Sequence, residues 1–255
     1  MFTYELLILC CTAFAAGFID SIVGGGGLIQ TPAVLILLPN YPIATLLGTT
    51  KIPSFAGTAI AAWQYTRRVS LNIKLITAIA AISFLSSITG AYCVSIIPNN
   101  VLKPIILVIL IGVVIYVYTK KNFGMLDALT IDPKKAIFRG VISGLLIGFY
   151  DGFIGPGTGS FLIMVFIVLL GNDFLHANAS AKLINLATNL AAIIYFSSTG
   201  HILWHYAIPM AVCNIVGAYT GSKLALLKGN SFIRVFFLIV VIGTIIRFAY
   251  DTFLK

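Results

Sequence analysis

Charged residues are scarce in this chain, and acidic residues are the scarcest of them. Asp, Glu, Lys and Arg together make up 9% of the 255 residues, and only 7 residues are acidic. A soluble domain carries about 25% charged residues, so this chain has too few to cover a water-facing surface. With 60% hydrophobic residues and a mean hydropathy of +1.06, the sequence excludes an ordinary soluble domain and indicates a membrane protein.

Cysteine and histidine are also few, and they lack the spacing of a metal site. The cysteines lie in apolar runs without a CxxC pair, and we interpret them as small apolar residues within the membrane. The histidines lie in or near loops without a fourth ligand. We therefore predict no disulfide, no metal and no cofactor. The residues concerned are Cys10, Cys11, Cys93, Cys213, His176, His201 and His205.

The net charge of +9 comes from basic residues that cluster between apolar runs. In a soluble protein this excess would suggest nucleic acid. Between membrane segments, Lys and Arg more often set the orientation, because loops rich in them stay on the cytoplasmic side. Residues 4–23 lack the basic start of a signal peptide and are predicted as the first membrane helix. We expect a multi-pass protein of the cell (inner) membrane without a nucleic-acid partner.

The apolar residues fall into ten segments. About 20 apolar residues span the ~30 Å hydrocarbon core as a helix, but two segments are about half that length and follow glycine-rich breaks. The predicted fold is an all-α polytopic membrane protein, with about eight full transmembrane helices and two short half-helices. The segments are 4–23, 28–38, 44–65, 72–96, 101–118, 137–154, 160–170, 177–198, 202–227 and 231–250.

The two halves of the sequence match each other at a constant offset of 131 residues. GFID at 17–20 matches GFYD at 148–151, and Lys51 in TTKI matches Lys182 in SAKL. Such an offset through Gly, Asp and Lys positions is hard to obtain by chance, so we predict an internal duplication. Repeat 1 covers 1–118 and repeat 2 covers 137–255, and the polar segment 119–136 is predicted to be a cytoplasmic linker.

The relative orientation of the repeats depends on how often each one crosses the membrane. Five crossings per half give inverted repeats, whereas four give parallel repeats. In the five-crossing arrangement both termini lie outside, and Arg67, Arg68, Lys74 and the linker lie inside. This arrangement fits the positive-inside rule better, so we favour inverted repeats over parallel ones.

The glycine-rich breaks are the strongest functional motif. Backbone polar groups cannot face lipid unpaired, so an unwound segment at membrane depth lines a cavity or is buried in protein. Free N–H groups where a half-helix begins form an anion site, and discontinuous helices in both halves indicate a transporter. The alternative is that the glycines allow close helix packing. The break residues are Gly24, Gly25, Gly26, Gly27, Gly155, Gly157, Thr158 and Gly159.

Two lysines and two aspartates lie inside apolar segments: Asp20, Lys51, Asp151 and Lys182. A cation within the membrane costs at least ~2.5 kcal/mol, which an anionic substrate or a carboxylate would offset. The alternative is that the lysines snorkel to the interface. The aspartates have three candidate roles: to pair with the lysines, to cap the half-helices, or to carry a coupling proton.

A polar stripe follows Lys182 along the same predicted helix. Asn185 and Asn189 are four residues apart and share a face, and the matching positions in the first half are also polar, Ser54 and Thr58. The stripe either lines a pathway or bonds a neighbouring helix. We include Asn185 among the candidate substrate-binding residues.

The motifs GFIDSIVGGGG and GFYDGFIGPGTGSF, with GTTKI and ASAKL downstream, resemble the TauE/SafE sulfite exporter family of bacterial membrane transporters over essentially the whole chain. The resemblance implies transport of small sulfur-containing or organic anions such as sulfite or sulfonates. We therefore expect a secondary transporter, an exporter, that binds its anion between the two repeats. The expected partners are the anion, the lipid bilayer and a coupling proton or sodium ion.

Three other functions remain as alternatives. A passive anion channel would move the same substrates without a coupled gradient. An intramembrane enzyme would need a nucleophile partner that the lysines and aspartates lack, so we predict that the chain is not an enzyme. A non-transporting membrane subunit would pack its motif residues against other helices, with no cavity between the halves.

Overall fold

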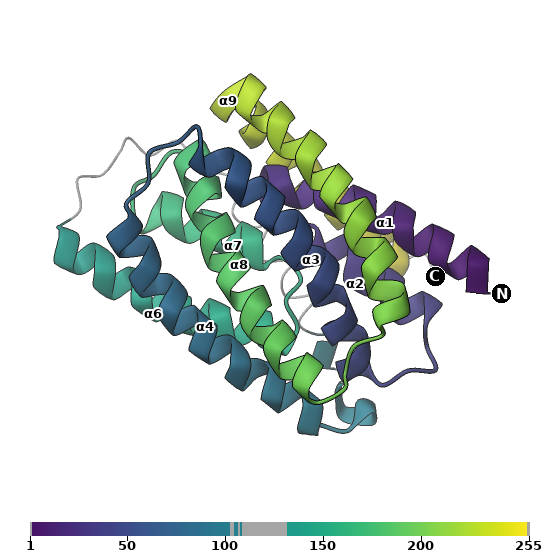
Figure 1. Cartoon of the computed structure of the whole chain (residues 1–255). Helices are drawn as coiled ribbons and strands as arrows, with labels where there is room; N and C mark the ends of the chain where they lie inside the picture. The colour runs from purple at the N-terminus through teal and green to yellow at the C-terminus, as the bar shows by residue number, and fades with distance from the viewer. Residues whose placement is uncertain (1, 103–104, 107, 109–131, 254–255) are drawn as a thin grey trace.

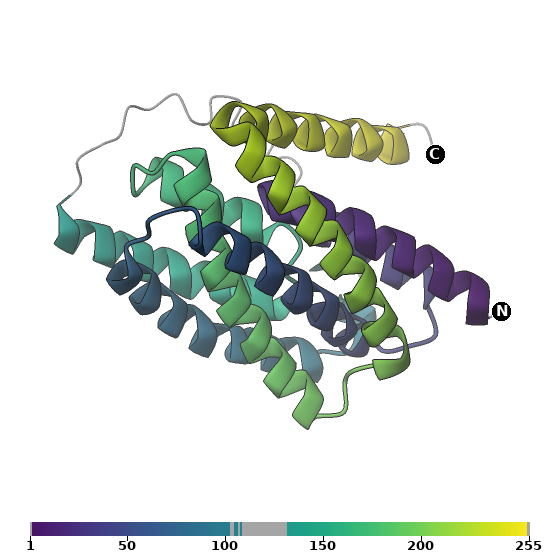
Figure 2. The ribbon, with the colours of Figure 1, turned by 45° about the horizontal axis from the view of Figure 1, so that its top comes forward.

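The computed structural model describes residues 2–102, 105–106, 108 and 132–253, and the elements described there are α-helices (Figure 1). The chain after Gly229 turns sharply, because this glycine has a left-handed φ of 70°, and a second helical segment of α9 continues from there (Figure 2). The helices are α1 Phe2–Val23, α2 Gly27–Leu37, α3 Ile43–Thr66, α4 Ile73–Ile96, α6 Pro133–Phe153, α7 Thr158–Val168, α8 Phe174–Ser198 and α9 Trp204–Phe253.

Within the described residues, five helices are long and apolar enough to cross a membrane. The prediction of an all-α, multi-pass membrane protein is therefore confirmed. The helix α3 is equally long but is not among these five, and Thr49, Thr50 and Lys51 are buried inside it. The five candidate spans are Tyr4–Val23, Ile73–Ile96, Lys134–Phe153, Phe174–Ser198 and Trp204–Gly229.

Two predicted segments lie largely or wholly outside the residues that the structure describes. They are the crossing predicted at 101–118 and the linker residues 119–131. The helix α6 begins at Pro133, within the predicted linker, because the Asp132 side chain caps it by accepting a hydrogen bond from the Lys134 N–H at 2.9 Å. The division into two repeats and a linker stays a prediction.

The helices α2 and α7 are short, and each has 11 residues. At 1.5 Å per residue they are about 16 Å long, roughly half of the ~30 Å hydrocarbon core. The first begins at Gly27 and the second at Thr158, each within a glycine-rich break. Both short helices pack against the long ones and end at the start of a further loop.

Helix packing pairs early elements with late ones. The helix α1 packs mainly against α9, α4 packs mainly against α6, and α3 and α8 lie between these two outer pairs (Figure 1). The starts of α6, α7, α8 and α9 follow the starts of α1, α2, α3 and α4 by 131 residues each. The pair of α1 and α9 is therefore the equivalent of the pair of α6 and α4, with the two halves of the chain exchanged.

Matched helices begin at opposite ends of the bundle. Near the start of α9, Tyr206 donates to Glu5 of α1 at 3.4 Å, and the Leu203 N–H donates to Thr49 in the second turn of α3 at 3.0 Å. The starts of α1, α3 and α9 thus share one end. At the other end of α3, Asn72 caps α4 and lies in one groove with Ala136 of α6. The helix α6 therefore begins at the opposite end from α1.

Basic side chains gather at the end where α4 and α6 begin. Of the ten Lys and Arg residues whose side chains the structure describes, only Lys51 and Lys182 lie elsewhere, inside the bundle. The asymmetry matches what the positive-inside rule expects of a cytoplasmic face. The eight residues at this end are Arg67, Arg68, Lys74, Lys134, Lys135, Arg139, Lys223 and Lys228.

Candidate functional site

The two glycine-rich breaks touch each other in the middle of the bundle. The Ser160 N–H donates to the Gly24 carbonyl oxygen at 3.0 Å. A Cβ added to Gly24 would lie 2.3 Å from the carbonyl carbon of Gly159, and Gly24 has a φ of 78°. Because only glycine allows both this approach and this backbone angle, the sequence GGGG brings the two breaks together.

A small cavity of about 30 Å³ lies between the breaks. That volume has room for only a water molecule or two. It is lined by residues of both breaks together with α3 and α8, and most of the predicted site residues meet there. The predicted residues that line it are Asp20, Gly24, Gly27, Lys51, Asp151, Gly155, Gly157, Thr158, Gly159 and Asn185. The three that do not are Gly25, Gly26 and Lys182.

The buried lysines form ion pairs that cross between the two halves. The Lys51 ammonium lies 3.1 Å from Asp151 Oδ1, and the Lys182 ammonium lies 2.8 Å from Asp20 Oδ2. Each lysine also donates to the main-chain oxygen of the same aspartate. Both lysines are buried, so the snorkelling alternative is wrong: the carboxylates hold the ammonium groups inside the protein.

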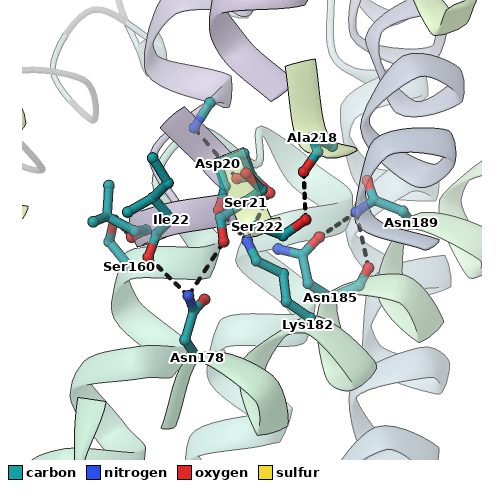
Figure 3. Close-up of polar contacts among 12 residues, drawn as sticks. Asp20, Ser21, Ile22, Ser160, Asn178, Lys182, Asn185, Asn189, Ala218 and Ser222 are labelled. Atoms are coloured by element: carbon teal, nitrogen blue, oxygen red, sulfur yellow. Dashed lines mark hydrogen bonds and ion pairs between the residues drawn. The ribbon is translucent and has the colours of Figure 1, made fainter. Parts of the chain in front are cut away.

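The Asp20 carboxylate has a partner on each oxygen. Its Oδ2 accepts from Lys182 (Figure 3), and its Oδ1 accepts from the Gly26 N–H at 3.3 Å, at the N-terminus of α2. An acidic side chain at a helix N-terminus satisfies free N–H groups and stabilises the positive end of the helix dipole. Pairing with a lysine and capping, which the sequence left as alternatives, are therefore combined in Asp20.

The Asp151 carboxylate is held on one oxygen only. Its Oδ1 accepts from Lys51, whereas its Oδ2 is buried and has no hydrogen-bond partner among the described residues. Space for the ammonium comes from Gly155, because a Cβ there would lie 2.7 Å from Lys51 Nζ. The two ion pairs are thus alike in their residues and different in their surroundings.

The end of α1 is satisfied by side chains that the sequence did not single out. The last carbonyl groups of a helix have no partner within it, and inside a membrane each unpaired group costs several kcal/mol. Here the Asn178 amide donates to the oxygens of Ser21 at 3.2 Å and Ile22 at 2.8 Å (Figure 3). The Tyr65 hydroxyl also donates to the Ser21 oxygen, at 2.9 Å.

Asn178 could have been found from the spacing along α8. It precedes Lys182 by four residues, so it extends the stripe of Lys182, Asn185 and Asn189 by one helical turn. Figure 3 shows Asn178 and Lys182 reaching the same end of α1. The Asn189 amide donates to the Asn185 main-chain oxygen at 2.8 Å, and both residues line the cavity. The stripe therefore faces the cavity and α1. Asn185 and Asn189 are hydrogen-bonded to each other within α8.

A second polar cluster, also missed from the sequence, connects α2, α3 and α9. The Gln30 amide donates to the Thr50 main-chain oxygen at 3.0 Å, and the Asn214 amide donates to Gln30 Oε1 at 3.1 Å. Thr31 and Thr50 line the cavity beside it. Single polar residues in three separate apolar runs gave no pattern that predicts this contact.

The histidines do not assemble a metal site in the described part of the chain, where no group of three His, Cys, Asp or Glu residues is close enough to hold an ion. His176 lies 2.7 Å from Asp173 at the exposed start of α8. His201 lies 2.9 Å from the Thr199 hydroxyl in the loop before α9. These contacts are local and lie away from the cavity.

Comparison with known proteins gives a family and several relatives of similar length. The sequence profile of the sulfite exporter TauE/SafE family matches residues 9–248. The probable membrane transporter protein ORF9 of Sinorhizobium sp is 37% identical, covering 96% of this chain and 93% of the relative. A probable membrane transporter protein of Haemophilus influenzae is 34% identical (96% and 95% covered), and YfcA of Escherichia coli K12 is 32% identical (96% and 90%). No solved structure matches the chain.

Proposed function

We propose, because the chain belongs to the sulfite exporter TauE/SafE family of membrane transporters, that it is a secondary transporter that exports small sulfur-containing or organic anions, sulfite or sulfonates among them. The family consists of transporters and not of enzymes, and the chain is a multi-pass membrane protein. The names of these relatives give no substrate, so sulfite and sulfonates are proposed from the family, and the site supports an anion in general.

The observation that carries the proposal is the cavity where α2 and α7 begin. Helix N-termini present free N–H groups and a partial positive charge, which together favour anions. Gly27 and Thr158, the first residues of the two short helices, line this cavity together with Lys51. In the proposed site the anion binds between the two helix starts and replaces the Asp151 carboxylate as the partner of the Lys51 ammonium.

The small size of the cavity supports a transporter over a passive channel. A channel needs a continuous path, whereas this cavity holds about 30 Å³ and is bounded by backbone contact between Gly24 and Ser160. An oxyanion of sulfur is larger than the one or two waters that this volume can hold. Binding therefore requires the two halves to move apart, as expected for alternating access about a central site.

We also propose that the two halves are inverted repeats. Three observations support this: the 131-residue spacing of helix starts, the opposite ends at which α1 and α6 begin, and the exchange of ion-pair partners between halves. An axis in the membrane plane would relate Lys51–Asp151 to Lys182–Asp20. The two short helices, again within this proposal, reach only to the middle of the bilayer.

The proposed orientation places the basic end of the bundle in the cytoplasm. Arg67, Arg68 and Lys74 lie at this end with the start of α6, and the start of α1 lies at the other. Under the positive-inside rule the N-terminus is then outside. Labelling of an introduced cysteine by an impermeant reagent tests this: a cysteine near Tyr4 reacts in intact cells, and one at Arg68 reacts only after lysis.

Anion flux in proteoliposomes tests the function. Purified protein is expected to move sulfite or methanesulfonate, and Lys51→Ala combined with Lys182→Ala is expected to abolish this movement. Lys223→Ala, which removes a lysine far from the cavity, is the matched control and keeps the flux. Absence of protein-dependent flux for sulfite, thiosulfate and sulfonates alike would reject the anion class. If the anion never accumulates beyond its own equilibrium when a proton or sodium gradient is imposed, the passive channel is favoured.

A further inference from the structure

The second oxygen of Asp151 is a buried acceptor that nothing in the described structure satisfies. Its Oδ1 has the Lys51 ammonium at 3.1 Å, but Oδ2 is enclosed without a hydrogen-bond partner. An ionised carboxylate oxygen in that position loses its hydration and gains no bond in return. A proton on Oδ2 would remove the negative charge that Lys51 balances.

We propose that Asp151 binds the coupling proton at Oδ2 and that this proton and the transported anion bind together. The idea rests on the proposed function, because it assigns the coupling step of the same site. The proton comes from water and stays on Oδ2, and no other covalent bond changes. Lys51 keeps its bond to the Asp151 main-chain oxygen and exchanges Oδ1 for the anion.

The charge balance of the pair explains why the two ligands bind together. Lys51 and ionised Asp151 are neutral as a pair, so they attract an anion weakly. Once Asp151 is protonated, the same site carries one positive charge, which the anion then neutralises. An uncompensated buried charge is strongly unfavourable, so each ligand stabilises the binding of the other. The loaded site is neutral for a monovalent anion, so its movement across the membrane carries no net charge and does not depend on the membrane potential.

The other charged and titratable groups around Asp151 are already engaged. On α8, Lys182 is bonded to Asp20 of α1, and on α6 itself the Tyr150 hydroxyl donates to the Pro156 oxygen. The α7 hydroxyl of Thr158 donates to the Gly155 oxygen at 2.7 Å. The described residues of α4 that meet α6 are apolar residues, serines and a glycine, and none of them is titratable. Within the described residues, Lys51 is therefore the charge that acts on Asp151.

Asp20, the counterpart of Asp151, is not suited to this role. Both of its oxygens accept hydrogen bonds, from Lys182 and from the Gly26 N–H, and its side chain is 22% exposed against 3% for Asp151. Protonation would weaken both bonds and leave the start of α2 without its cap. The two aspartates thus divide the work: Asp20 is a positioning residue for α2, and Asp151 carries the proton.

Infrared difference spectroscopy of the full chain in lipid nanodiscs tests the proton site without requiring transport. Between mildly alkaline and mildly acidic buffer, the wild type is expected to gain the C=O band of a protonated carboxyl group. Asp151→Asn abolishes this band, and Asp20→Asn, the matched control, retains it. If Asp151→Asn does not fold, Lys51→Gln combined with Asp151→Asn removes the pair without leaving a charge, and it too lacks the band.

Methanesulfonate then tests the linkage, because its own charge does not change across this range. At a fixed pH it is expected to strengthen the band, and its affinity is expected to fall about tenfold per pH unit as the pH rises, for one proton bound per anion. Affinity in Asp151→Asn is independent of pH. Because both the band and the pH dependence are expected to disappear in Asp151→Asn, they assign the proton to Asp151 and not to another acidic residue of the chain.

Three results would overturn the proposal. They are a band that survives in Asp151→Asn, a band lost in Asp20→Asn instead, and anion binding that depends on sodium and not on pH. Failure of every tested anion to bind would reject the proposed substrate class, while the band in the anion-free protein would still decide the proton site. The two failures are therefore distinguishable.

Discussion

The Lys51–Asp151 and Lys182–Asp20 pairs occupy equivalent positions in the two halves, yet their surroundings differ. Around Asp20, both carboxylate oxygens accept hydrogen bonds, from Lys182 and the Gly26 N–H, and the Asn178 amide donates to main-chain oxygens near the end of α1. Around Asp151, one carboxylate oxygen is left without a partner in the described structure. The comparison teaches that two identical pairs of residues can differ in their bonding, because one carboxylate has a partner on each oxygen and the other keeps an oxygen without one in the described structure.

The largest expected difference in stability is between alanine substitutions at two adjacent glycines of the first break, Gly24 and Gly25. Gly24→Ala places a Cβ 2.3 Å from the Gly159 carbonyl carbon at a φ of 78°, so the breaks cannot meet. We expect a loss of roughly 3 kcal/mol or more of stability and no transport. Gly25→Ala meets nothing nearer than 3.7 Å and should be tolerated. Thermal unfolding in detergent compares the two, and equal unfolding temperatures would contradict the backbone contact.

Removing each lysine in turn tests the inequality of the pairs. Lys51→Met leaves Asp151 buried without any partner, and we expect a loss of about 3–5 kcal/mol. Lys182→Met should cost less, because Asp20 is partly exposed and keeps the Gly26 N–H. Adding Asp151→Asn to Lys51→Met should restore much of the stability. Chemical unfolding of the three variants measures this, and equal losses in both pairs would show that their surroundings do not matter.

A smaller effect concerns the side chain that satisfies the end of α1. Asn178→Leu leaves the Ser21 and Ile22 oxygens with fewer donors, and we expect a loss of about 1–3 kcal/mol. Gln64→Leu is the control, because Gln64 also donates an amide to a main-chain oxygen, that of Tyr219, but at an exposed position. Its stability should hardly change. If the two substitutions have the same effect, burial of the carbonyl groups is not what makes Asn178 necessary.

The smallest effect is expected at the exposed pair of His176 and Asp173. Its atoms are 2.7 Å apart, closer than those of Lys51 and Asp151, but both side chains are more than a third exposed. Exposed ion pairs contribute about 0–1 kcal/mol, so His176→Ala should leave stability and anion flux nearly unchanged. Unfolding temperature and flux are measured side by side with the Lys51 variants. A large loss would mean that distance, and not burial, decides the value of a pair here.

Much of the candidate site was accessible from the sequence. Helix positions, the short segments after the breaks and the unusual charges at Asp20, Lys51, Asp151 and Lys182 all follow from the high cost of polar groups in lipid. Ten of the thirteen predicted site residues line the cavity. Gln30 and Asn214 were missed, because the contact joins isolated residues 184 positions apart, and no local spacing indicates such a contact.

The sequence by itself determined that this is a helical membrane protein, where its helices break, and which charges lie inside it, because each of these depends on the solvation of single residues or short segments. Only the tertiary structure decided which lysine meets which aspartate, that each pair crosses between the halves, and that Asp151 keeps an unpartnered oxygen while Asp20 does not. These facts depend on distances between helices far apart in the chain, and two halves with the same motif differ there because their neighbours differ.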